Sequence, residues 1–152
     1  RLVLVVGGGA VARRRAETLL RCGARVRAVS PRFCDGFPEV AERLQRAFAP
    51  EDLDGALLAV AASGSRTTNR EASRRTRERG IPVSVADNAA EGDFFFPSLV
   101  ASGAAAASVS SAGLSCSLTR RLSDRLRAVW EGWVAEERAT LQQEKGGTEG
   151  CD

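Results

Sequence analysis

The sequence predicts an α/β protein with a doubly wound parallel sheet, followed by a small part made of a hairpin and one long helix. The apolar run Leu2 to Val6 ends at three consecutive glycines, and such an uninterrupted run is typical of a parallel strand buried on both faces. Strand-like and helix-like segments then alternate as far as Ala86, which is the pattern of a parallel sheet with helical connections.

A first βαβ unit follows from a change of period after the glycines. A helix begins at Ala10, and its apolar residues recur at helical spacing, namely Val11, Ala16, Leu19 and Leu20. Gly23 lies where a helix commonly ends. The second strand covers Arg25 to Ser30 and stops at Pro31.

The alternation then continues more loosely. We expect a helix over Glu39 to Phe48, a buried strand over Leu57 to Ala62, an Arg-rich polar helix over Thr67 to Arg79, and a strand over Val83 to Ala86.

The chain changes character after this strand. A polar loop, Asp87 to Asp93, leads to two strand-like segments, Phe94 to Val100 and Ala104 to Ser110, which we expect to pair as a hairpin. A long helix is expected from Ser115 to about Thr140.

A domain boundary is expected near residue 90. The first domain then covers residues 1–90, a dimerisation hairpin and helix cover 91–141, and a disordered tail covers 142–152. The apolar stretch Phe94 to Val100 and the helix face with Trp130 and Trp133 exceed what so small a part can bury alone. This predicts a homodimer through the second domain.

Composition argues against several classes of protein. Hydrophobic residues make up 43% of the chain, too many for a disordered protein, yet no apolar run approaches the roughly 18 residues of a membrane span. The net charge of +3 is modest, and acids interleave with the basic residues of Arg66 to Arg79, which indicates a solvated helix face, with an anionic ligand as the alternative. With 5% aromatic residues and no Tyr, nucleic acid is not expected as a partner.

The Cys and His content bears on metal binding and location. There is no His, and the Cys residues at positions 22, 34, 116 and 151 include no C-x-x-C pair, so we expect no metal site. Reduced thiols predict a cytoplasmic protein. The chain begins without Met, directly in a strand, which indicates that its first residues are missing.

The glycines form a Gly7-x-Gly9-x-x-Ala12 motif between the first strand and the first helix. Small residues there allow a tight turn, close approach of a pyrophosphate, and packing of the helix on the strand. The pyrophosphate would meet free N–H groups at the helix start. The motif therefore predicts a Rossmann-like dinucleotide site at Gly7, Gly9, Ala10 and Val11, and the alternative is a turn selected for packing alone.

The end of the second strand lacks the acid that often binds the ribose hydroxyls of NAD. Ser30, Pro31 and Arg32 occupy that place, and we expect Pro31 and Arg32 near the adenosine ribose. Arg32 could meet the 2′-phosphate of NADP, or it could be a solvated loop charge. We expect NAD as the cofactor and keep NADP as the alternative.

Asp87 follows the strand Val83 to Ala86 directly, which places a carboxylate at the sheet edge where open α/β sheets bind ligands. The alternative is a cap for the N–H groups that follow it. Because the chain has no His and no Tyr, carboxylates are the strongest candidates for proton transfer, and Asp93 is the other one in this loop.

The segment Ser110 to Ser115 precedes the long helix. Its hydroxyls and Gly113 suit a helix N-cap, and the alternative is a loop that faces an anionic ligand.

Several segments, in order along the chain, carry a family signature. They are Val6 to Arg15 with Leu19 and Leu20, Ala59 to Ala62 with Asn69, Val85 to Ser98, and Ser110 to Ser115 with Leu118 to Leu122. Together they resemble the precorrin-2 dehydrogenase/sirohydrochlorin ferrochelatase family, the N-terminal module of sirohaem synthase.

The resemblance implies an NAD-dependent oxidation of precorrin-2 to sirohydrochlorin, with insertion of ferrous iron in many members. It implies that Asp87 acts in both steps and as the general base in the first. It places Ser111 near the active site, in a substrate-side loop group with Asn88, Gly113 and Ser115. It also implies dimerisation through the part after the Rossmann-like domain.

The chain departs from the family pattern at four places, which are Ser30 to Arg32, Ala62 to Ser65, Ala112, and Ser115–Cys116. No methyltransferase module is found, so we expect a part of the multifunctional enzyme rather than the whole. An NAD-sensing regulatory domain without catalysis and a degenerate structural remnant are the alternative functions.

Overall fold

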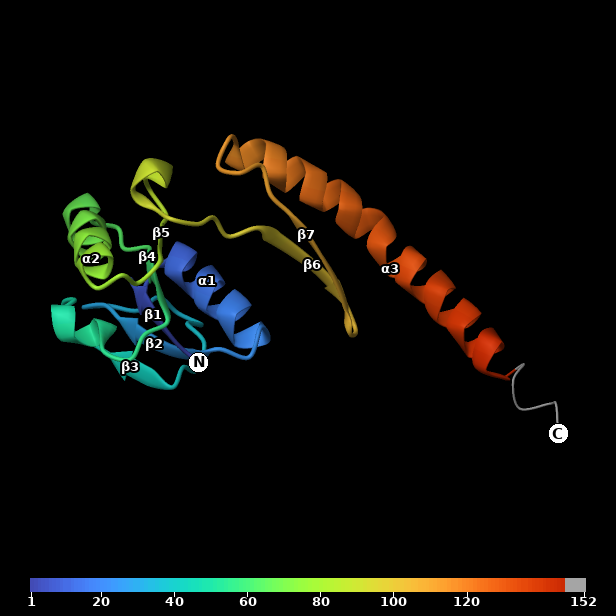
Figure 1. Ribbon diagram of the computed structural model, residues 1–152, viewed down its shortest axis with the longest axis horizontal. Helices are drawn as coiled ribbons and strands as arrows, with labels where there is room; N and C mark the ends of the chain where they lie inside the picture. The colour runs from blue at the N-terminus through green and yellow to red at the C-terminus, as the bar shows by residue number, and fades with distance from the viewer. Residues whose placement is uncertain (147–152) are drawn as a thin grey trace. The chain divides into compact units, whose positions relative to one another are not determined.

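A computed structural model describes residues 1–146 (Figure 1). The chain divides into two compact units, Arg1–Phe96 and Pro97–Asp152, which we call the sheet unit and the hairpin–helix unit. The predicted α/β class with a parallel sheet, a hairpin and a long helix is confirmed.

The sheet unit is built on five parallel strands in the order β3-β2-β1-β4-β5. The strands are β1 (Leu2–Val6), β2 (Arg25–Val29), β3 (Glu42–Leu44), β4 (Leu58–Ala61) and β5 (Val83–Val85). The helices are α1 (Ala10–Arg21), α2 (Arg66–Glu78) and the short 3-10 turns η1 (Pro50–Leu53) and η2 (Ala89–Glu91). The strand order reverses between β1 and β4, so their carboxyl ends form a switch point, where such sheets bind ligands.

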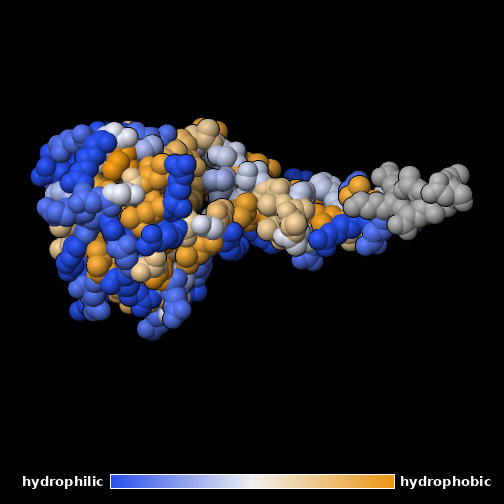
Figure 2. Space-filling model, turned by 60° about the horizontal axis from the view of Figure 1, so that its bottom comes forward, coloured by the Kyte–Doolittle hydropathy of each residue, from blue (hydrophilic) through white to orange (hydrophobic). Residues whose placement is uncertain are grey.

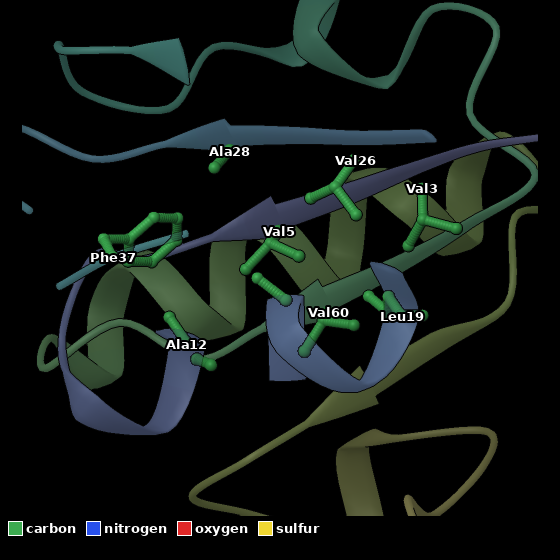
Figure 3. Packing of buried hydrophobic residues seen from close by; sticks show 10 residues of the cluster. Val3, Val5, Ala12, Leu19, Val26, Ala28, Phe37 and Val60 are labelled. Carbon is green, nitrogen blue, oxygen red and sulfur yellow. The ribbon is translucent and has the colours of Figure 1, made fainter. Parts of the chain in front are cut away.

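Helices α1 and α2 cover opposite faces of the sheet. In β1, Val3 and Val5 belong to a buried cluster with Ala12 and Leu19 of α1, as Figure 3 shows. The residues that alternate with them in β1 belong to a second cluster, which includes Ala72 of α2. Burial on both faces explains why the first strand is an uninterrupted apolar run.

The helix expected over Glu39 to Phe48 is wrong, because this segment holds β3, which pairs with the end of β2. Arg27 of β2 fixes the pairing. Its Nε donates to a Glu42 carboxylate oxygen at 2.6 Å, and its Nη1 donates to the Asp52 carbonyl oxygen at 2.8 Å. Such contacts with distant segments override a weak local helix pattern.

The sheet unit extends past the boundary expected near residue 90, which falls inside η2. The chain after η2 returns along β5: the Asp93 backbone N–H donates to the Val83 carbonyl at 2.7 Å, and the Asp93 carboxylate accepts from the Val83 N–H at 2.9 Å. Phe96, the last residue of the unit, packs beside the α1 cluster under the Arg15 guanidinium, 4.5 Å from its ring centre.

The hairpin–helix unit consists of an antiparallel pair, β6 (Ser98–Ser102) and β7 (Ala105–Val109), and the helix α3 (Cys116–Gly146). The hydroxyl groups of Ser98 and of the buried Ser123 lie 2.6 Å apart and join β6 to α3. Helix α3 continues through residue 146, so the tail expected from residue 142 is wrong up to that point, and residues 147–152 lie outside the described part. Within residues 1–146, no helix is long and apolar enough to cross a membrane.

Candidate functional site

The five parallel strands end on the same side, so a loop follows each of them at the carboxyl edge of the sheet. Four of these loops carry residues of the candidate site, and they follow β1 at Gly7, β2 at Ser30, β4 at Ala62 and β5 at Ala86. The sheet unit therefore brings together the predicted cofactor residues Gly7, Gly9, Ala10, Val11, Pro31 and Arg32, and also Asp87.

The three glycines of the turn after β1 have different surroundings. A β-carbon on Gly7, whose φ is 132°, would lie 2.4 Å from the Ala62 carbonyl oxygen, and one on Gly8 would lie 2.0 Å from the Arg32 carbonyl oxygen. A β-carbon on Gly9 would meet nothing within 4 Å. Gly7 and Gly8 thus allow the loops after β4 and β2 to approach the turn closely, and of the three glycines only Gly9 faces open space.

Gly9 is also the N-cap of α1. It has no side chain to cap the helix, and the first turn of α1 carries no acid. The first N–H groups of a helix have no intrahelical partner and attract anions. Free N–H groups and open space at a helix start are the features that a pyrophosphate site uses.

Arg32, after β2, is exposed and is held at its backbone. The Ser30 hydroxyl donates to the Arg32 carbonyl oxygen at 2.6 Å. Within residues 1–143, whose side chains the structure describes, none pairs with the Arg32 guanidinium. A shallow depression of about 400 Å³ lies beside it, lined in part by Phe33, Phe37 and Arg43.

Asn69 organises the loop after β4 and is a site residue that pattern reasoning did not explain. It is fully buried in α2, and its side-chain oxygen accepts from the Ser63 N–H at 2.9 Å, while its Nδ2 donates to the Ser63 carbonyl at 3.1 Å. The available signal was spacing, because Asn69 recurs at helical spacing with Ala72, Ser73 and Thr76, the other buried residues of α2. Ser65 then caps α2 by accepting from the Thr68 N–H at 3.3 Å.

Asp87 lies just past the carboxyl end of β5 with its side chain 35% exposed. It forms an ion pair with Arg66, whose Nη1 lies 3.5 Å from an Asp87 carboxylate oxygen. The capping role expected as the alternative for Asp87 belongs instead to Asn88, whose side chain accepts from the Ala90 N–H at 3.1 Å. Asp93 bonds to Val83 at the amino end of β5, so the two acids of the loop lie toward opposite edges of the sheet.

Arg66 also donates a hydrogen bond to the Glu91 carboxylate. This bond lowers the pKa of Glu91 and raises that of Arg66, so both groups stay charged near neutral pH. Sequence reasoning missed both residues, because nothing in a pattern reveals a contact between side chains that lie 25 positions apart.

The predicted loop residues Ser111, Gly113 and Ser115 belong to the hairpin–helix unit and share one turn before α3. The Ser115 hydroxyl accepts from the Leu118 N–H at 3.2 Å, and the Ser111 hydroxyl donates to the Ser115 carbonyl at 3.0 Å. Ala112, a departure from the family pattern, has a φ of 49°, a conformation that favours glycine. The turn thus serves as the N-cap of α3.

No three acidic, Cys or His side chains gather as a metal site within the described residues. The thiols of Cys22, Cys34 and Cys116 are free.

Comparison with known proteins places this site in a family context. Residues 1–98 match a family model described as "Putative NAD(P)-binding". The siroheme synthase of Photorhabdus laumondii is 37% identical over 134 residues, which are 85% of this chain and 28% of that protein. The siroheme synthase of Nitrosomonas eutropha is 39% identical over 132 residues, with 83% and 28% covered. The chain thus spans 28% of the length of these curated relatives.

A solved structure described as "SirC, precorrin-2 dehydrogenase" superposes with a TM-score of 0.71. The superposition covers 89% of this chain and 71% of that one, at 24% sequence identity. The two chains therefore share a fold.

Proposed function

The chain belongs to this NAD(P)-binding family, and from that premise we propose that it oxidises precorrin-2 to sirohydrochlorin with NAD as the acceptor. The proposal is supported by the resemblance to siroheme synthases along most of the chain and by the fold shared with a precorrin-2 dehydrogenase. The observation that carries it is the open glycine turn at the switch point of the sheet, with Asp87 at the same edge.

The residues of the glycine turn fit a dinucleotide. Gly9 leaves room for the pyrophosphate, and the N–H groups of Ala10 and Val11 open α1 beside it. Bound NAD supplies the hydride acceptor for the reaction. The chain's own part is to hold the reacting groups together and to accept a proton.

Pro31 and Arg32 lie at the end of β2, where the adenosine ribose is expected in this fold. We propose NAD as the natural cofactor. Since the Arg32 guanidinium has no partner among the described residues, it is free to bind a 2′-phosphate, and NADP should also be accepted. Calorimetry with both dinucleotides decides between them, and Arg32→Ala should weaken only the binding of NADP.

Asp87 is proposed as the general base. The oxidation removes a hydride and a proton from the macrocycle, and the gain of conjugation in the product favours it. Asp87 accepts the proton, for which the chain offers no His. Asn88 and the turn with Ser111, Gly113 and Ser115 are proposed to face the substrate.

We propose further that the protein is a homodimer in the cytoplasm. Large apolar side chains of the hairpin–helix unit remain exposed, including Leu114 at 81%, Trp133 at 52% and Leu141 at 53%. Figure 2 shows hydrophobic residues of this unit at the surface, next to hydrophilic ones. A second copy would bury them. The free thiols of the described part fit a reducing compartment.

The experiment that tests this function is to mix the protein with precorrin-2 and NAD and to follow the absorbance spectrum of sirohydrochlorin. Conversion at a rate that depends on the protein supports a dehydrogenase. Tight binding of NAD without any conversion would instead identify a regulatory binding domain.

A further inference from the structure

The guanidinium of Arg66 lies between two carboxylates at the carboxyl edge of the sheet. Its Nη2 donates to one oxygen of Glu91, and its Nη1 lies 3.5 Å from an oxygen of Asp87. The charged groups placed next to Asp87 are thus Arg66 of α2 and Glu91 of η2, with Arg70 of α2 also acting on Glu91.

The positions of these groups are fixed from both sides. Arg66 is the first residue of α2, directly after the Ser65 cap. The buried hydroxyl of Ser73 donates to the Glu91 backbone carbonyl at 2.7 Å. The second carboxylate oxygen of Glu91 is buried and has no hydrogen-bond partner in the described part of the chain. Because a buried carboxylate oxygen without a partner is unfavourable, Glu91 depends on the hydrogen bond from Arg66.

The two contacts of Arg66 differ in kind. The contact with Glu91 is a charge-assisted hydrogen bond, whereas 3.5 Å is too long for a good hydrogen bond to Asp87. Arg66 therefore attracts the Asp87 carboxylate by charge and leaves its lone pairs free to accept a proton. A direct hydrogen bond from Arg66 would occupy one of those lone pairs.

We infer that Arg66 is a positioning residue for Asp87, and that Glu91 holds Arg66 in the place where it acts. The inference rests on the proposed role of Asp87 as the base. The three residues then have different roles. Asp87 accepts the proton, Arg66 orients the Asp87 carboxylate, and Glu91 accepts the hydrogen bond that Arg66 donates.

Substitutions at Arg66 and Glu91 test the inference. The carboxyl carbon of Asp87 is followed by NMR at one neutral pH in the protein without ligands. Arg66→Ala should change the chemical shift of this carbon, because the guanidinium 3.5 Å from the Asp87 carboxylate is removed. Glu91→Gln should also change it, because Arg66 then loses its charge-assisted hydrogen bond to a carboxylate. Arg66→Lys should stay near the wild type.

Turnover provides the second readout. In Arg66→Ala, kcat at neutral pH should fall about tenfold because the base is no longer oriented, while KM for NAD stays unchanged. Arg66→Lys should restore most of the loss. A purely structural role would lower the melting temperature without this separation of kcat from KM.

The inference is overturned if the Asp87 carboxyl signal is the same in the wild type, Arg66→Ala and Glu91→Gln. The proposed function fails in a different way, which is full turnover in Asp87→Ala. A changed Asp87 signal in both variants supports the coupling of Arg66 to Asp87 even if no turnover is found, because that measurement needs neither NAD nor substrate.

Discussion

The two units of this chain bury their side chains very differently. In the sheet unit, nearly every residue of β1, β4 and β5 is buried. In the hairpin–helix unit, β7 has no buried residue, and among the described residues only Val100 and Ser123 are buried. The sheet unit thus contains its own core, whereas the hairpin–helix unit exposes the apolar surface that a partner would cover. We therefore expect chemistry and cofactor binding to depend on the first unit and assembly on the second.

The largest effect is expected at the edge of the sheet unit. Asp87→Ala should lower turnover by ~10²–10⁴-fold, the usual contribution of a general base, and leave NAD affinity nearly intact. Asp93→Ala is the matched control, because its carboxylate bonds to the amino end of β5 and should matter for stability rather than turnover. Steady-state kinetics and calorimetry on both variants measure this. If turnover falls in Asp93→Ala and not in Asp87→Ala, the general base lies in this loop but is Asp93.

Substitutions in the hairpin–helix unit should instead weaken the assembly of the homodimer. Trp133→Glu combined with Leu141→Glu should weaken the homodimer at least about a hundredfold, since each large apolar side chain contributes ~1.5–3 kcal/mol when buried. Gln142→Glu combined with Gln143→Glu adds the same two charges at exposed polar positions and should leave the dimer intact. Sedimentation at micromolar concentration measures the change. A wild-type protein that sediments only as a monomer would contradict the assignment of assembly to the hairpin–helix unit.

A smaller effect is expected at the glycine turn. Gly9→Asp should weaken NAD binding at least about tenfold, or about 1.4 kcal/mol, because it puts a negative charge where the pyrophosphate is expected. Gly9→Asn has nearly the same shape without the charge, and both residues are good N-caps in a position with open space. Asn should therefore bind NAD better than Asp. Equal, wild-type affinity in both folded variants would move the cofactor away from this turn.

Features of the fold that depend on residues adjacent in sequence could be predicted, whereas features that depend on distant contacts could not. The apolar run, the glycines and the helix after them lie next to one another in sequence, and their pattern predicted β1, the turn and α1. The strand β3 was missed because Arg27 and Glu42 meet only in the folded chain. Gly8 was also passed over, since its close approach to Arg32 is invisible in the motif.

The candidate site shows the same division. Asp87 was predicted because a residue that follows a parallel strand must lie at the carboxyl edge. The partners Arg66 and Glu91 were not, because the distance between side chains on different elements does not follow from spacing. The end of α3 was placed too early, since the polar composition after residue 141 resembles a tail although the helix continues.

The smallest effect concerns a buried acid in the sheet unit. Burial by itself raises the pKa of Asp52. Hydrogen bonds from Arg46 and from the Ala49 N–H outweigh this effect and leave the pKa of Asp52 below its usual value. Such a lowered pKa stabilises the folded state at pH values above the pKa of Asp in the unfolded chain. This stabilisation is lost as the pH falls through the lower pKa of the folded state. Asp52→Asn should cost about 1 kcal/mol at neutral pH. That difference should shrink below about pH 4 in denaturant titrations, and a difference that stays constant with pH would contradict the assignment.

We propose that the sheet unit carries out a dehydrogenation with a dinucleotide bound at its glycine turn. To test this, NADH and sirohydrochlorin are followed together, in the absence of air, after precorrin-2 and NAD are mixed with the wild type or with Gly9→Asp. We expect equal amounts of both products with the wild type and a slower appearance of both with Gly9→Asp at limiting NAD. Sirohydrochlorin that forms without NADH, or equally fast with Gly9→Asp, would contradict the proposal.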